Sequence, residues 1–256
     1  MTPTYQSDNE RKIPIDDPSG KWSDMTLLPD WGEEFYNVYT AKKHGKWVML
    51  KALKPEFSDD PEKRDRMERE FDTKYNIGHP NIVRVIDFED VPGIGRAIIT
   101  DDVYGQSLQS LIDSGNVTPR ILDRIQTQLP DALEYIQLRH IVHRPICLDT
   151  IIFTEKGENI KLIDIGYDQS YALSEQDSAD DIRAYGEILA KTLDSLPTDL
   201  PKLRKIADKC RMEKSPFRTF ADIKLAIEKR SANQIYIFLC IVIIILVMLL
   251  IFLTIN

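Results

Sequence analysis

The stretch at positions 143–166 reads HRPICLDTIIFTEKGENIKLIDIG and decides how the rest of the chain is interpreted. Two short apolar runs, IIF and IKLI, flank a turn-forming K-G-E-N sequence. Apolar runs that are bounded by Gly and Asn are typical of a β-hairpin. The stretch therefore predicts two antiparallel strands, preceded by His143-Arg144 and followed by Asp164-Ile165-Gly166.

The composition around this stretch is that of a globular protein. The chain has 256 residues, of which 43% are hydrophobic and 29% charged, enough for one or two domains with a core. Its net charge is −8, and its basic residues form no long run. Because phosphate contacts need clustered Lys and Arg, we expect no nucleic-acid partner.

The cysteines and histidines do not have the spacing of a metal site. No C-x-x-C pattern occurs, and the histidines do not cluster with the cysteines. An odd number of widely separated cysteines is typical of reduced, structural residues in a cytosolic domain. The residues concerned are Cys147, Cys210, Cys240, His44, His79, His140 and His143.

The two ends of the chain differ in kind. Residues 1–23 are polar and contain prolines without an apolar core segment, which predicts a flexible arm and no secretory signal. Residues 235–255 form a run of 21 residues without a charge, IYIFLCIVIIILVMLLIFLTI. Such a run can span a hydrocarbon layer of roughly 30 Å, and it lacks the polar face of a soluble core helix. We therefore predict a transmembrane helix.

Basic residues indicate the orientation of this span. Lys224, Lys229 and Arg230 precede it, and only Asn256 follows it. Positive charge favours the cytoplasmic side of a membrane. The sequence thus predicts a tail-anchored, single-pass membrane protein whose N-terminal domain is cytoplasmic.

Several motifs follow one another in a fixed order along the chain. Two strand-like runs at 35–42 and 46–53 are separated by His44-Gly45, and the second contains W-V-M-L-K. A segment of helical character that begins PEKRDRMEREFDTKY comes next, followed by H-P-N-I-V at 79–83, then G-Q-S-L at 105–108 and finally the H-R and D-I-G elements. In this order they resemble the motifs of the eukaryotic-type Ser/Thr protein kinases.

The resemblance implies an α+β, two-lobed protein-kinase-like fold over residues 24–230. A small lobe, a β-sheet with one main helix, would cover 24–100, and a larger helical lobe would cover 101–230. The transmembrane helix follows the second lobe. No internal repeat competes with this interpretation.

The resemblance also assigns roles to particular residues. Lys51 stands where the family contacts phosphates, and Glu70 where it has the carboxylate that pairs with that lysine. Thr100 and Asp101 take the gatekeeper and first hinge positions. Asp164 takes the metal-binding position of D-F-G. ATP and Mg²⁺ are the ligands that these positions imply.

The catalytic segment departs from the family at three positions. Pro145 replaces the catalytic Asp, so no catalytic residue is assigned there, because proline has no acid–base function. Cys147 and Thr150 replace the phosphate-facing Lys and the metal-binding Asn. Asp149 could substitute for the missing base, although a turn carboxylate is the simpler interpretation.

The nucleotide-facing part of the small lobe departs as well. The three glycines of the phosphate loop are replaced by Trp31, Glu33 and Tyr36, and Met49 stands in the place of the small alanine that packs on adenine. The segment after Gly166 is short and polar, whereas Asp181 matches the start of a helix that anchors the catalytic loop.

Two functions are compatible with this pattern. The favoured one is a membrane-anchored pseudokinase, a signalling scaffold with weak or no ATP binding, whose partners are proteins such as another kinase or its substrate. The alternative is an atypical Ser/Thr kinase that uses Lys51 and Asp164 without a dedicated base. That alternative is open because phosphoryl transfer depends mainly on positioning and electrostatics.

Overall fold

The computed structural model describes residues 11–103, 105–140, 146–154, 159–163 and 175–228. The chain divides into two compact units. The first comprises residues up to Asn116 together with Tyr135–Leu173, and the second comprises Val117–Glu134 and the residues from Ser174 onward. The first unit thus reaches beyond the lobe boundary expected at residue 100.

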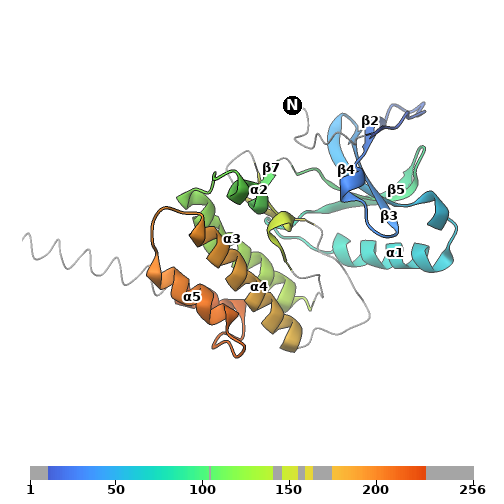
Figure 1. Ribbon diagram of the computed structural model, residues 1–256. Helices are drawn as coiled ribbons and strands as arrows, with labels where there is room; N and C mark the ends of the chain where they lie inside the picture. Colours follow the sequence, from blue (N-terminus) through green and yellow to red (C-terminus); the bar gives the residue numbers. More distant parts are fainter. Residues whose placement is uncertain (1–10, 104, 141–145, 155–158, 164–174, 229–256) are drawn as a thin grey trace, which may run out of the picture. The chain divides into compact units, whose positions relative to one another are not determined.

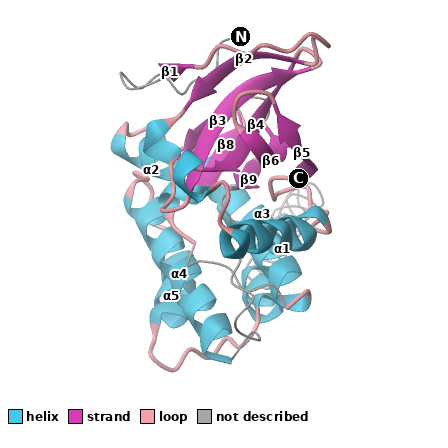
Figure 2. Ribbon diagram, turned by 90° about the vertical axis from the view of Figure 1, so that its right-hand side faces the viewer, coloured by secondary structure: helices cyan, strands magenta, loops and turns pink. Residues whose placement is uncertain are grey.

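The first unit is built on a six-stranded antiparallel sheet with the strand order β1-β2-β3-β4-β6-β5. Figure 1 shows these strands in blue to green, and Figure 2 shows them in magenta. The strands are β1 (Arg11–Lys12), β2 (Trp22–Leu27), β3 (Tyr36–Lys43), β4 (Lys46–Leu53), β5 (Val85–Val91) and β6 (Gly95–Asp101). Short 3-10 helices lie at Pro29–Trp31 and Pro55–Phe57.

Strands β3 and β4 form the predicted hairpin. His44 and Gly45 both have positive φ, at 50° and 78°. Two central residues with positive φ give the turn whose twist matches the flanking strands. Along β4 the side chains alternate, so Leu50 is buried in the core on one face whereas Lys51 lies on the opposite face.

Helix α1 (Pro61–Tyr75) packs against the sheet on the Lys51 side (Figures 1 and 2). Its N-cap is Asp60, whose carboxylate accepts hydrogen bonds from the N–H groups of Glu62 and Lys63 at 2.9 and 3.3 Å. Met67 and Glu70 are the buried residues of the helix, three positions apart and therefore on one face. Met67 packs with the sheet core, which places Glu70 next to β4.

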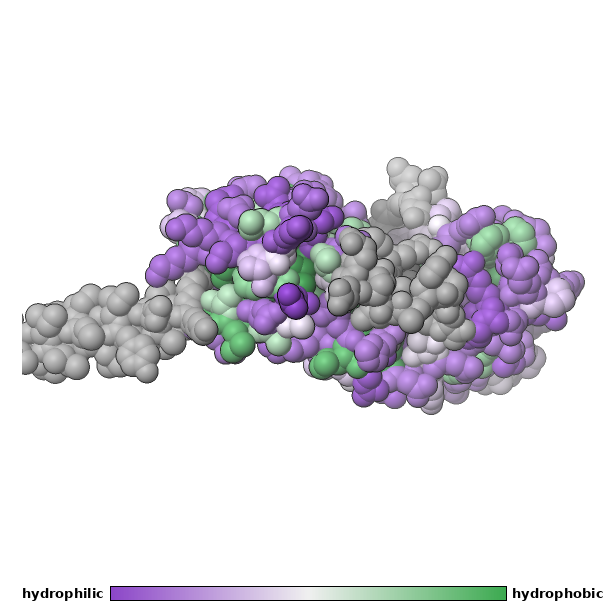
Figure 3. Space-filling view, turned by 90° about the horizontal axis from the view of Figure 1, so that it is seen from below, coloured by the Kyte–Doolittle hydropathy of each residue, from purple (hydrophilic) through white to green (hydrophobic). Residues whose placement is uncertain are grey.

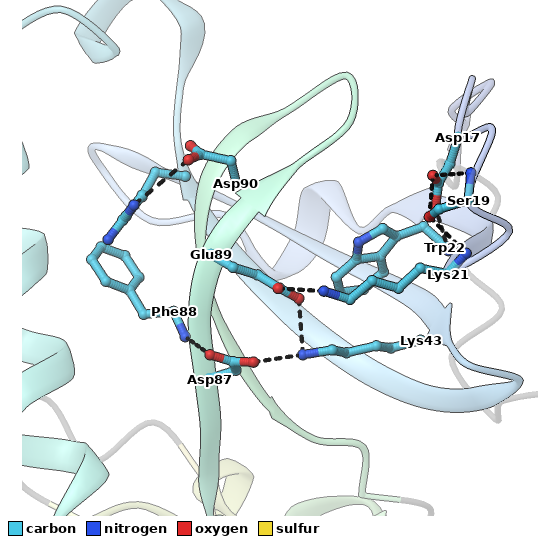
Figure 4. Close-up of polar contacts among 10 residues, drawn as sticks. Asp17, Ser19, Lys21, Trp22, Lys43, Asp87, Phe88, Glu89 and Asp90 are labelled. Atoms are coloured by element: carbon cyan, nitrogen blue, oxygen red, sulfur yellow. Dashed lines mark hydrogen bonds and ion pairs between the residues drawn. The ribbon is translucent and has the colours of Figure 1, made fainter.

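Part of the segment expected as a flexible arm is built into the sheet. Residues 11–12 form the edge strand β1, and Trp22 is 5% exposed within the core above the sheet. Lys21 and Lys43 lie over the Trp22 ring and form ion pairs with Glu89 of β5, as Figure 4 shows. Because the segment is polar overall, its composition did not predict the burial of Trp22 or the ion pairs with Glu89. Residues 1–10 lie outside the described residues.

A second, three-stranded sheet belongs to the same unit, in the order β7-β8-β9. Its strands β8 (Ile151–Thr154) and β9 (Ile160–Leu162) pair antiparallel, with Ile151 opposite Leu162, as the opening stretch of sequence predicts. Strand β7 (Gly105–Ser107) pairs with β8 so closely that a Cβ on Gly105 would lie 1.9 Å from the Phe153 oxygen. Helix α2 (Leu108–Asp113) follows β7, and a 3-10 turn (Leu148–Thr150) precedes β8.

The H-P-N-I-V segment joins the two sheets. The Asn81 side chain donates to the Ile160 carbonyl at 3.0 Å, and the Asn81 carbonyl accepts from the Leu162 N–H at 2.8 Å. The Val83 N–H donates to the Leu162 carbonyl at 2.9 Å. These bonds fix strand β9, which leads directly to the predicted metal-binding position.

The second unit is helical. Its main helices are α3 (Pro119–Leu138), whose last residues count with the first unit, α4 (Glu175–Asp194) and α5 (Pro201–Arg211), and residues 220–228 are also helical. Gly186 of α4 allows close packing on α5, since a Cβ there would lie 2.7 Å from Cys210 Cβ. The buried Tyr185 hydroxyl donates to the Ile125 carbonyl at 3.3 Å. Asp181 is buried in α4 at 6% exposure.

On the face drawn in Figure 3, apolar residues are scattered among hydrophilic ones, which is ordinary for a surface that faces water. Within the described part of the chain, no helix has the length and apolar character needed to cross a membrane. The predicted span at 235–255 lies outside that part.

Candidate active site

The first unit contains a cavity of about 840 Å³, a size typical of small-molecule sites. Its walls come from both sheets and from the loop before β3. The apolar lining consists of Trp31, Val38, Met49, Leu50, Val83, Val103, Ile152 and Ile163, and the charged lining of Glu33, Glu34, Lys51, Lys74 and Asp149.

Lys51 is the central cation of this cavity. Its Nζ lies 3.0 Å from Glu70 Oε1, so the pair that the resemblance implies is formed between β4 and α1. The same Nζ lies 2.5 Å from Glu33 Oε1 and 4.3 Å from the centre of the Tyr36 ring. The Lys51 side chain is only 16% exposed, so these contacts are made largely away from water.

Glu70 is shared by two lysines. Lys74, one helical turn further along α1, places its Nζ 2.6 Å from the same Oε1 that contacts Lys51. Burial raises the pKa of Glu70, but the ammonium groups of Lys74 and Lys51 outweigh burial and hold that pKa at about 2. Glu70 is therefore an anion at any physiological pH.

The pKa of Lys51 reflects the same contacts. Burial alone would lower it, whereas the carboxylates of Glu70 and Glu33 raise it above its ordinary value. Lys51 is thus firmly charged, and its charge is already balanced by groups of the chain itself. A ligand anion would have to compete with these carboxylates.

Tyr36 supports Lys51 from the sheet. It stands at the third glycine position of the family loop, and its side chain is 3% exposed in the core with Met67. Burial raises the pKa of its hydroxyl, which makes no hydrogen bond to any other described residue. A tyrosine ring at this position fills space that a glycine would leave open.

Thr150, at the position of the metal-binding Asn, uses its hydroxyl locally. The hydroxyl accepts a hydrogen bond from the Cys147 N–H at 3.3 Å and donates to the Cys147 carbonyl at 3.0 Å. Thr150 and Asp149 both line the cavity. The Thr150 oxygen is therefore engaged in closing its own turn.

Thr100 and Asp101, the predicted gatekeeper and first hinge residues, differ in their surroundings. Thr100 lines the cavity, directly opposite Met49 in the β4–β6 pairing. Asp101 is exposed, does not line the cavity, and donates its N–H to the Arg84 carbonyl at 3.0 Å. The roles of Lys51, Glu70, Thr100 and Asp101 in binding a cofactor stay predictions.

Several residues that the sequence predicts for the site are not among the described residues of this cavity. Pro145 and Asp164 lie outside the described residues, and Asp181 belongs to the second unit. Across the described parts of the chain, no group of three or more His, Cys, Asp or Glu is placed to hold a metal ion. The assignment of Asp164 as a metal ligand stays a prediction.

Sequence reasoning missed two charged partners in the site. The spacing of four between Glu70 and Lys74 is the ordinary signal of a helical ion pair and could have revealed the second lysine. The contact of Glu33 with Lys51 has no such signal. It depends on the turn before β3, which is closed by the Glu33 N–H and the Tyr36 carbonyl at 2.9 Å.

The described residues do not fit a magnesium-bound triphosphate. Three carboxylates, Glu33, Glu34 and Asp149, line the cavity with two ammonium groups, Lys51 and Lys74. Glu33 takes the place on Lys51 that a phosphate oxygen would need, and the Thr150 hydroxyl is engaged in its turn. Repulsion between like charges in a partly buried site opposes a polyphosphate.

Similarity to known proteins agrees with the fold. Residues 34–185 match the family model of the protein kinase domain. Serine/threonine-protein kinase 36 of Pongo abelii is 30% identical over 135 residues, which are 52% of this chain and 10% of that protein. PrkC of Bacillus subtilis is 29% identical over 151 residues, which are 58% of this chain and 23% of that protein. The chain spans a minor part of these curated relatives.

Solved kinase structures have the same fold. Rad53 in complex with AMP-PNP superposes with a TM-score of 0.60 at 18% identity, covering 78% of this chain and 64% of that chain. The PknI kinase domain of Mycobacterium tuberculosis superposes with a TM-score of 0.56 at 22% identity, covering 82% and 96%. Since the family model matches more than half of its residues, the chain belongs to the protein kinase domain family.

Proposed function

We propose that this protein is a pseudokinase: a protein-kinase-fold binding module that acts as a signalling scaffold and does not transfer phosphate. Its partners are proteins, such as an active kinase or the substrate of one. The fold provides a frame for binding proteins, and the substituted cavity lacks the groups that phosphoryl transfer needs. Fold alone does not imply activity, so the proposal rests on the site.

The geometry at Thr150 is the observation that carries the proposal. Its hydroxyl bridges the N–H and the carbonyl of Cys147, so the position that in the family holds metal serves a local turn instead. In the sequence, two residues before Cys147, Pro145 stands in the place of the catalytic Asp. A general base contributes roughly 10²–10⁴-fold to such a reaction, and proline supplies none of it.

We also propose that residues 235–255 anchor the protein in a membrane as a single span, with the kinase-like domain in the cytoplasm. The support is the sequence: 21 consecutive uncharged residues preceded by Lys224, Lys229 and Arg230. A tethered domain meets membrane-bound partners at a raised local concentration, which suits a scaffold.

One observation favours the alternative of an atypical, ATP-dependent Ser/Thr kinase. The ion pair between Lys51 and Glu70 is formed at 3.0 Å, and it is the pair that active kinases need in place. A binding module needs the pair only as a link between β4 and α1. Activity therefore separates the two functions.

The test is phosphate incorporation by the full chain, purified in mild detergent, with radiolabelled ATP, Mg²⁺ or Mn²⁺ and a generic protein substrate. The Lys51→Ala variant defines the background. Lys46→Ala is the matched control, because Lys46 is exposed at the other end of the same strand. We expect the wild type, Lys51→Ala and Lys46→Ala to incorporate equal, background amounts.

Incorporation that is present in the wild type and in Lys46→Ala but absent in Lys51→Ala would establish the kinase alternative. Circular dichroism spectra of the three proteins show whether a loss of signal reflects unfolding.

A further inference from the structure

The Glu33 carboxylate lines the cavity and supplies a negative charge next to Lys51. Its Oε1 lies 2.5 Å from Lys51 Nζ, and the two side chains are 18% and 16% exposed. The hydrogen bond from the Glu33 N–H to the Tyr36 carbonyl, 2.9 Å long, holds the turn that presents the carboxylate. The contact of Glu33 with Lys51 is therefore made from a hydrogen-bonded turn and not between two exposed side chains.

The neighbouring charges reinforce this effect. The other carboxylate on Lys51, that of Glu70, is also held by Lys74. Glu34 adds a further negative charge to the lining of the cavity. A polyphosphate that approached Lys51 would have to displace Glu33 and would then leave that carboxylate in a partly buried, negatively charged site. Leaving one member of a buried ion pair without its partner is strongly unfavourable.

The rest of the cavity suits an uncharged ligand. Val38 and Met49 of the six-stranded sheet and Ile152 of the three-stranded sheet give it an apolar lining. Thr100 and Gln106 add polar groups that can orient a ligand without adding charge. Sites for small molecules commonly combine an apolar wall with a few polar groups.

We propose that Glu33 determines the specificity of this cavity: it takes the place of a ligand phosphate on Lys51, so the cavity binds an uncharged, nucleoside-sized aromatic ligand and rejects polyphosphates. The inference deepens the proposed pseudokinase function and rests on it, because it names the ligand class of the same cavity.

Calorimetric titration of the full chain with adenosine and with Mg²⁺–ATP tests the proposal. In the wild type we expect adenosine to bind at least about tenfold more tightly than ATP. In Glu33→Gln, which keeps the shape of the side chain, the affinity for ATP should rise at least about tenfold and that for adenosine change less than about threefold. Glu56→Gln is the matched control, since Glu56 is exposed and does not line the cavity; the affinity for ATP should change less than about threefold.

Three results would overturn the inference: ATP binding at least as tightly as adenosine in the wild type, an unchanged ratio of affinities in Glu33→Gln, or no binding of either probe to any variant. An equal gain in Glu33→Gln and Glu56→Gln would also overturn it, because the net charge of the protein and not the Lys51 contact would then set the affinity for ATP. Failure here leaves the absence of phosphate transfer untouched. Conversely, transfer measured with radiolabelled ATP would remove the pseudokinase function without changing the order of the affinities.

Discussion

Lys51 has the ion-pair partner that the kinase family has at this position, but the other groups around it differ from those of the family. The lysine and its partner Glu70 are both present and 3.0 Å apart. A second carboxylate, Glu33, and an aromatic ring, Tyr36, have been added around the same ammonium group. The charge of the lysine is retained, but its balance now comes from the chain itself.

The pKa of Glu70 leads to a prediction about stability and pH. Its value of about 2 in the folded chain lies below the value of 4.5 in the unfolded chain, so the folded state binds fewer protons. The contribution of Glu70, roughly 3 kcal/mol, is fully present above pH 4.5 and is lost as the pH falls toward 2. We expect the free energy of unfolding of Glu70→Gln, measured with urea, to be lower than that of the wild type at pH 7 and to approach it at pH 3.

Glu68→Gln is the control for this experiment, because Glu68 is exposed on the same helix. Its free energy of unfolding should follow that of the wild type at every pH. A difference between the wild type and Glu70→Gln that stays constant from pH 7 to pH 3 would contradict the ionic role of Glu70.

At the scale of elements, the N-terminal segment is a structural part of the sheet. Trp22 is buried between the ion pairs of Lys21 and Lys43 and the apolar core that includes Met25. We expect Trp22→Ala to lower the free energy of unfolding by about 3–5 kcal/mol, as is usual for the removal of a buried Trp side chain. Circular dichroism during urea unfolding measures the change without relying on tryptophan fluorescence.

Trp47→Ala provides the comparison, since Trp47 on β4 is only partly buried and contacts the Lys42 ammonium group, which lies over its ring. Its effect should be clearly smaller. Equal losses in the two variants would mean that the N-terminal segment adds nothing particular to the core.

The contact between β7 and β8 makes a second prediction at this scale. A methyl group on Gly105 would lie 1.9 Å from the Phe153 oxygen, so the strands would have to separate. We expect Gly105→Ala to destabilise the protein by at least about 2 kcal/mol in urea unfolding. Gly78→Ala, where a Cβ meets nothing within 4 Å and φ is not positive, should change stability by less than about 1 kcal/mol.

The elements that the sequence predicts well are those with a local signal. Alternation and the His44-Gly45 turn predict the hairpin of β3 and β4, and the apolar runs predict β8 and β9. The strand at residues 11–12 has no such signal, because its two residues, Arg11 and Lys12, are both exposed and charged. It forms only because β2 offers an unpaired edge, which is a property of the folded sheet.

At the scale of the whole molecule, the chain is a member of the protein kinase domain family. The fold is predictable because its motifs occur in order over most of the chain. The site is less predictable: Lys51 and Glu70 can be found by resemblance, whereas the contact of Glu33 with Lys51 arises from a turn whose shape depends on tertiary structure.

We propose that the protein keeps the frame of the kinase fold but does not transfer phosphate. The most direct test is the rate of ADP formation by the full chain at saturating Mg²⁺–ATP, compared between the wild type and Lys51→Ala. We predict equal rates at the level of the buffer blank. A wild-type rate that exceeds the Lys51→Ala rate by about tenfold or more would contradict the account, because a working phosphate site at Lys51 would then be present.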